Sequence, residues 1–74
     1  MKITVKLFAT LRENREKIFE LNTLEKATPS DVAAILAISE KDIAIIMVNG
    51  RGVEAQHVLK DGDVLALFPP VGGG

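Results

Sequence analysis

The sequence contains no cysteine and a single histidine, His57. Without cysteine, the chain can form neither a disulfide scaffold nor a thiolate metal site, and it has no cysteine nucleophile. His57 has no second histidine or cysteine with which to share a metal, so we interpret it as a surface or loop residue. Neither serine lies in a Gly-x-Ser-x-Gly elbow, and no glycine-rich nucleotide-binding motif occurs. We therefore expect no bound metal, no bound cofactor and no catalysis by the isolated chain.

Long apolar runs and an excess of one charge are also missing. No run approaches the roughly 20 apolar residues that span a bilayer, and the first residues, 1–5, alternate in polarity where a signal peptide would be continuously apolar. Lysine and arginine number 9 against 10 aspartates and glutamates, which gives a net charge of −1 and no basic excess for nucleic acid. We expect a cytoplasmic protein that binds neither nucleic acid nor a membrane.

What is present is enough for one small folded domain. The chain has 74 residues, of which 47% are hydrophobic and 26% are charged. That hydrophobic content, together with the low net charge, argues against intrinsic disorder. The length leaves no room for a second domain.

The first third of the chain predicts two strands. Ile3, Val5 and Leu7 alternate with polar residues, which is typical of a strand with one buried face. A charged segment follows, with a short helical piece expected in residues 10–15. Apolar residues in 18–21 indicate a second strand, and the short connection is compatible with antiparallel pairing to the first.

The middle of the chain predicts one helix. Thr28 can cap free backbone N–H groups, Pro29 suits the first helical position, and Asp31 lies near the positive end of the helix dipole. The helix is expected to end near Ser39. Its apolar stripe is expected to contain Val32, Ile35 and Leu36.

The last third predicts further strands. The run 43–48 suits a strand that is buried on both sides or lies at a crowded edge of the core, and Asn49-Gly50 suits a tight turn to a short return strand near Val53. Residues 64–68 form the last strand, ended by two prolines. Two aspartates around a glycine, at 61–63, are typical of a turn rather than a cation site. The predicted fold is α+β: a mixed sheet of four to five strands with one helix packed on one face.

The chain is thus divided into a domain, residues 1–68, and a tail, residues 69–74. The tail reads Pro69-Pro70-Val71-Gly72-Gly73-Gly74. Two prolines stiffen its beginning, and its glycines carry no side chains, so the tail is a slim arm of at most about 20 Å that can enter a narrow channel. On the glycines alone, a frayed terminus is the more frequent outcome.

The residues before the glycines resemble a known family. Residues 67–74, Leu-Phe-Pro-Pro-Val-Gly-Gly-Gly, resemble the Phe-Phe-Pro-Pro-Val-x-Gly-Gly ending of the small subunit of molybdopterin synthase. Residues 5–13, 48–50 and 59–63 are similar to earlier segments of that family in the same order. Leu67 departs from the family by standing where a first phenylalanine is usual.

This resemblance implies a ubiquitin-like β-grasp fold and a role as a sulfur carrier. It implies that an ATP-dependent activating enzyme adenylates Gly74, and that sulfur from a donor protein then gives a thiocarboxylate. The tail is expected to enter the large subunit of molybdopterin synthase, where the sulfur is used for molybdopterin. Gly73 keeps the reacting carbon free of side chains, Gly72 occupies a variable position, and Pro69, Pro70 and Val71 direct the arm.

Alternatives remain within and outside this family. A thiamine-pathway sulfur carrier shares the Gly-Gly ending but usually lacks the Pro-Pro pair. A ubiquitin-like protein modifier, joined through Gly74 to lysines of target proteins, would begin with the same adenylation, and a plain interaction module would have an inert tail. Phe8 and Phe68, at strand ends, are expected either to form an exposed docking patch or to belong to the core.

Overall fold

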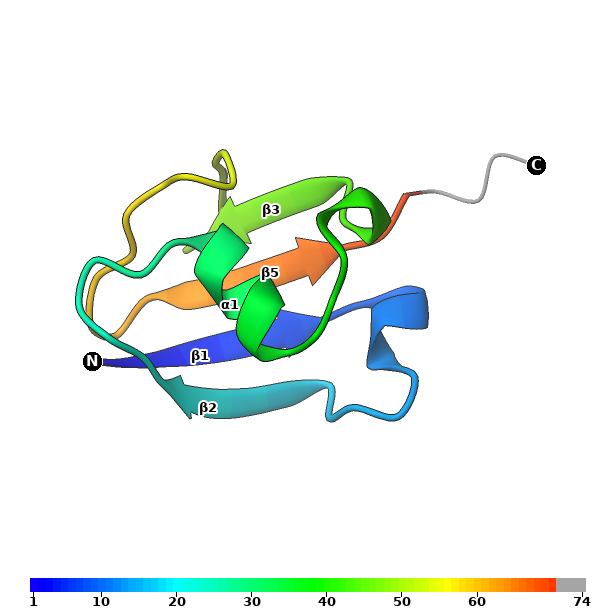
Figure 1. The fold of residues 1–74 in the computed structure, drawn as a ribbon, viewed down its shortest axis with the longest axis horizontal. Helices are drawn as coiled ribbons and strands as arrows, with labels where there is room; N and C mark the ends of the chain where they lie inside the picture. Colours follow the sequence, from blue (N-terminus) through cyan, green and yellow to red (C-terminus); the bar gives the residue numbers. More distant parts are fainter. Residues whose placement is uncertain (71–74) are drawn as a thin grey trace.

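The computed structural model describes residues 1–70. In this part of the chain, a five-stranded mixed sheet is covered on one face by a single short helix (Figure 1). The strand order across the sheet is β2-β1-β5-β3-β4. The strands are β1 (Lys2–Leu7), β2 (Ile18–Asn22), β3 (Ile45–Val48), β4 (Arg51–Gly52) and β5 (Val64–Phe68); the helix is α1 (Pro29–Ile35), and 3₁₀ turns occupy Ala9–Arg12 and Glu40–Asp42.

The first and last strands form the centre of the sheet. β1 is parallel to β5, with Val5 opposite Leu65, while β2 and β3 are antiparallel to their neighbours. A parallel pair needs a crossover, and the segment that contains α1 and β3 provides it. The five strands agree with the four to five that the sequence predicted and lie at or near the expected segments, and β1 and β2 are antiparallel as expected.

The core lies between the sheet and α1. Alternate residues of β1 and β5 point toward the helix and are at most 1% exposed. These inward residues are Ile3, Val5, Leu7, Leu65 and Leu67, and Val32 of α1 packs against them. The opposite face of the sheet has no covering element among residues 1–70 (Figure 1). The residues of β1 and β5 that alternate with the inward ones therefore lie on an open face.

The helix begins as predicted but ends earlier. Thr28 and Asp31 form a capping box, in which each side chain accepts a hydrogen bond from the other residue's backbone N–H, and Pro29 is the first residue. The helix ends at Ile35 rather than near Ser39. The N–H of Ile38 donates to Ala33 O and that of Ala37 to Ala34 O, while Ala37 has a φ of 58°. This is a Schellman ending. The sequence does not predict it, because alanine stands at the position where glycine is usual.

One expectation about burial is wrong, and one of the two alternatives for residues 43–48 is excluded. Ile35 is 56% exposed, because the short helix turns it away from the sheet while Val32 and Ala33 face the core. β3 is not buried on both sides: its outward residue Ile45 is 51% exposed on the open face, whereas Val48 is buried.

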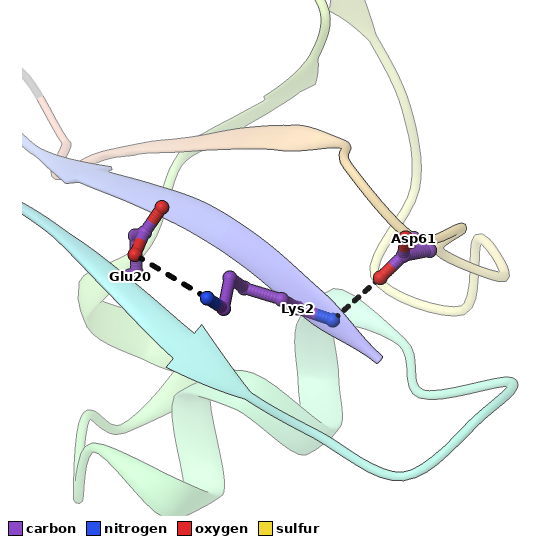
Figure 2. A network of polar contacts seen from close by, with 3 residues as sticks. All are labelled: Lys2, Glu20 and Asp61. Carbon is purple, nitrogen blue, oxygen red and sulfur yellow. Dashed lines mark hydrogen bonds and ion pairs between the residues drawn. The ribbon is translucent and has the colours of Figure 1, made fainter.

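The turn before β5 is stabilised by side chains, as the Asp-Gly-Asp pattern predicts. Gly62 has a φ of 87°, and the Asp63 carboxylate accepts hydrogen bonds from the Asn49 side chain at 2.9 Å and from the Lys60 N–H at 2.8 Å. Asp61 accepts a hydrogen bond from the backbone N–H of Lys2, whose ammonium lies 3.8 Å from Glu20 (Figure 2). These contacts connect the turn to the start of β1.

Candidate functional site

The candidate site is the end of the sheet from which the tail leaves. β5 lies between β1 and β3, and its last residues are hydrogen-bonded on both sides. The N–H of Phe8 donates to Leu67 O at 3.3 Å, and the N–H of Ala44 donates to Phe68 O at 2.8 Å. Pro69 is half-buried and Pro70 is exposed directly after this clamp. The sheet therefore fixes the position at which the tail starts.

An aromatic stack stands beside this exit. The rings of Phe8 and Phe68 are stacked, with centroids 4.2 Å apart and planes inclined by 11°. The Arg12 guanidinium carbon lies 5.3 Å from the Phe8 ring centroid, and Arg12 Nε donates to Leu7 O at 2.7 Å. The cation thus lies within the range of a cation–π contact and holds the 3₁₀ turn against the stack.

Both phenylalanines are half-buried and lie outside the core. Phe8 comes directly after β1 and Phe68 is the last residue of β5, and both continue the alternation on its outward side. The stack therefore belongs to the open face of the sheet. Of the two places that the sequence left open, the structure therefore assigns the pair to the surface at the strand ends. Whether a partner binds there stays a prediction.

A mostly apolar groove of about 480 Å³ adjoins the stack. Its lining consists of Phe8, Ala9, Thr10, Ile45, Phe68, Pro69 and Pro70. Sequence reasoning missed Ile45, because an apolar run such as 43–48 does not reveal which members face solvent. The antiparallel register pairs Ile45 with Phe68 and thereby brings it to the tail exit.

A second hollow of about 390 Å³ touches the same two prolines and has a more polar lining. Thr10, Glu13, Arg15, Ser39 and Asp42 contribute to it. The tail therefore starts between an apolar groove and a polar one.

Within residues 1–70, no group of three or more His, Asp or Glu side chains is arranged to hold a metal ion. His57 is exposed and lines a different groove with Arg51 and Lys60, near the start of β5. In the same residues, no helix is long and apolar enough to cross a membrane.

The remaining predicted site residues are Val71, Gly72, Gly73 and Gly74, and they lie outside the described residues. The structure thus places Pro69, Pro70, Phe8 and Phe68 together at one end of the sheet. The roles predicted for the last four residues stay predictions.

The fold is the ubiquitin-like β-grasp. Small archaeal modifier protein 1 from Haloferax volcanii is 27% identical, with a TM-score of 0.78 and 100% of each chain covered. A putative molybdopterin converting factor subunit 1 from Pyrococcus furiosus is 33% identical, with a TM-score of 0.76, and the match covers 96% of this chain and 99% of that one. A chain in the complex of subunits 1 and 2 of molybdopterin-converting factor from Helicobacter pylori is 29% identical, with a TM-score of 0.68 and full coverage of both chains.

A model of the ThiS family matches residues 5–74. The chain belongs to the ThiS family, and with it to the class of ubiquitin-like sulfur carriers. It is homologous to subunit 1 of molybdopterin-converting factor. A search among curated proteins finds no match.

Proposed function

We propose that this chain carries sulfur as a thiocarboxylate on Gly74 and donates it in the biosynthesis of molybdopterin. The observation that carries the proposal is that the family match runs through Gly74 and so includes the terminal glycines. The likeness to a molybdopterin converting factor subunit, at 33% identity over 96% of the chain, supports the choice of pathway. Pro69-Pro70 supports it over the thiamine pathway.

The proposed chemistry needs little from the chain beyond an accessible carboxylate. A carboxylate oxygen of Gly74 attacks the α-phosphorus of ATP, and pyrophosphate leaves. Hydrosulfide from the donor then attacks the carbonyl carbon, AMP leaves, and loss of the sulfur-bound proton follows. The product is a thiocarboxylate, a nucleophile near neutral pH. The activating enzyme binds the ATP and a donor protein supplies the sulfur, so the carrier itself needs neither a metal nor an acid–base pair.

The geometry of the exit supports this division of labour. A reacting atom at the end of an arm gains from a fixed starting point, because fewer arrangements of the arm must be searched. β5 supplies that point, since hydrogen bonds hold its last residues from both neighbouring strands. Pro69 and Pro70 then restrict the direction in which the arm departs.

We further propose that the groove beside the stack receives the partner. It is formed mainly by Phe8, Ile45 and Phe68, and it lies where the arm begins. A partner that binds there holds the arm at the entrance of its own active site. The existence of a complex between subunits 1 and 2 of the Helicobacter pylori factor supports a large-subunit partner.

The test is a reconstitution from purified components. The chain is incubated with its activating enzyme, ATP and a sulfur donor, and the product is then added to the large subunit and a pterin precursor. We expect dithiolene formation that depends on Gly74 and on ATP. If the loaded carrier leaves the pterin unchanged but sulfurates a thiamine precursor in a parallel assay, the pathway assignment is wrong.

A second candidate is a protein modifier that is conjugated to lysines through Gly74. The full-length match to small archaeal modifier protein 1, with a TM-score of 0.78, is the observation that favours it. Both roles begin with adenylation, so the fate of the activated glycine separates them. An affinity-tagged chain that forms ATP-dependent conjugates of higher mass in cell extract would support the modifier.

A further inference from the structure

We propose that the free edge of β2 is a second docking site, which accepts an extended peptide strand from a partner in antiparallel orientation. This site is separate from the tail exit and does not depend on the proposed sulfur chemistry. It rests on three features of the sheet: an unpaired backbone edge, a hollow between that edge and α1, and the charge at the middle of the strand.

The backbone of β2 offers hydrogen bonds along its outer side. The N–H of Leu7 donates to Lys17 O and the N–H of Thr23 donates to Met1 O. In an antiparallel pair, successive residues direct their backbone N–H and C=O groups alternately toward and away from the neighbouring strand. Residues 17, 19, 21 and 23 therefore face β1. Ile18, Glu20 and Asn22 direct their N–H and C=O groups away from the sheet, where no strand lies in the described part of the chain (Figure 1).

This edge carries little of the usual protection. Sheet edges are commonly blocked by charged side chains, lysine above all, by proline, by a bulge or by a very short strand. The opposite edge is β4, which has only two residues. β2 has five residues, without proline or lysine, and Glu20 at its middle is its one charged residue.

A hollow of about 210 Å³ lies on the helix side of β2. Arg15, Glu16, Phe19 and Leu36 line it, and Phe19 and Leu36 are only partly buried against the core. A strand added at the edge would direct every second side chain to this side of the sheet. Those side chains should be apolar.

The charge of Glu20 argues for a foreign strand rather than a second copy. In a symmetric antiparallel pairing that uses Ile18, Glu20 and Asn22 of both copies, Glu20 would stand opposite Glu20, and like charges directly opposite are destabilising. A partner with a basic residue opposite Glu20 would instead gain a favourable pair. Glu20 is 68% exposed, and the Lys2 ammonium 3.8 Å away is its ion-pair partner within residues 1–70 (Figure 2). The expected partner is therefore an extended segment with a basic residue flanked by two apolar residues.

The probe is a capped peptide, acetyl-Ser-Thr-Val-Lys-Val-Thr-Ser-amide, titrated into the full-length ¹⁵N-labelled chain. We expect saturable shifts and slowed exchange at the amides of Ile18, Glu20 and Asn22. N-methylation of the peptide's lysine removes the N–H that faces β2 and should weaken binding roughly tenfold. N-methylation of a flanking valine, whose N–H faces away, is the matched control and should leave binding nearly unchanged.

A charge swap tests the position of the pair. A peptide with glutamate in place of lysine should bind the wild-type chain roughly fivefold more weakly, and Glu20→Lys should reverse that preference. Shifts centred on the Phe8–Phe68 stack, no saturable shifts, or equal tolerance of both N-methylations would overturn the proposal. So would a dimer joined through β2 in solution, because it would make the edge a self-interface.

Discussion

Replacing Ile45 by aspartate should separate partner binding from folding. Ile45 is 51% exposed and lines the groove at the tail exit, so its exposed half is available to a partner. Val58 is also 51% exposed but does not line that groove. Ile45→Asp and Val58→Asp therefore each replace an equally exposed β-branched apolar side chain by aspartate. They differ in whether that side chain lines the groove.

The expected magnitude follows from the exposed half of the side chain. Complete burial of an isoleucine side chain stabilises by about 1.5–3 kcal/mol, so covering the remaining half of Ile45 should contribute about 1 kcal/mol to binding. Ile45→Ala should thus weaken the complex about fivefold. Aspartate adds the cost of removing a carboxylate from water in an apolar groove, about 2 kcal/mol or more, so Ile45→Asp should weaken the complex at least about a hundredfold.

The assay is calorimetric titration of each variant against the large subunit of molybdopterin synthase, with urea unfolding of each variant alone. Val58→Asp should bind within about twofold of the wild type, a difference of about 0.4 kcal/mol. Ile45→Asp should lose about 1 kcal/mol of stability, since aspartate is unfavourable in strands such as β3. Val58 lies outside the strands, in the segment before β5, so Val58→Asp should lose no more than that. Equal affinities for Ile45→Asp and Val58→Asp would refute the docking role of the groove.

Three further changes test the fold and the tail. Asn49→Ala should cost about 2 kcal/mol in urea unfolding, because the Asn49 amide donates to Asp63 and accepts from the N–H of Val64. Asn49→Gly keeps the positive φ of 51° accessible and should isolate the loss of those bonds; if both variants match the wild type, the network is not stabilising. Ala37→Gly should stabilise by about 1 kcal/mol, since Ala37 has a φ of 58° at the helix end, and no gain would contradict the Schellman interpretation. Deleting residues 73–74 should leave stability within about 0.5 kcal/mol while abolishing adenylation, and an unfolded product would show that the tail is structural.

The sequence predicted the fold where local chemistry determines it. The alternation of Ile3, Val5 and Leu7 predicts the inward face of β1, and the Thr28-Pro29 pair predicts where the helix begins. The helix end was wrong because Ala37 adopts a conformation that glycine usually occupies. That choice depends on the burial of Ile38 after the turn, which local propensity does not encode.

The candidate site was predictable in its motif but not in its surroundings. Pro69 and Pro70 predict where the last strand ends and the tail begins, because proline cannot donate a hydrogen bond to a neighbouring strand. The groove beside them depends on the register that places Ile45 opposite Phe68. The two residues are more than twenty positions apart in the sequence, and such pairing is a property of the assembled sheet. The stack of Phe8 on Phe68 depends in the same way on the parallel pairing of β1 and β5.

The most direct test of the central proposal is the mass of the carboxyl-terminal peptide after activation. The intact chain is incubated with its activating enzyme, ATP and a sulfur donor, digested, and compared with a reaction that lacks ATP. We predict a gain equal to the difference between one sulfur and one oxygen atom, located on Gly74 by fragmentation. If Gly74 keeps its ordinary carboxylate while an established carrier of the same family is converted in the same reaction, the chain does not carry sulfur in this way.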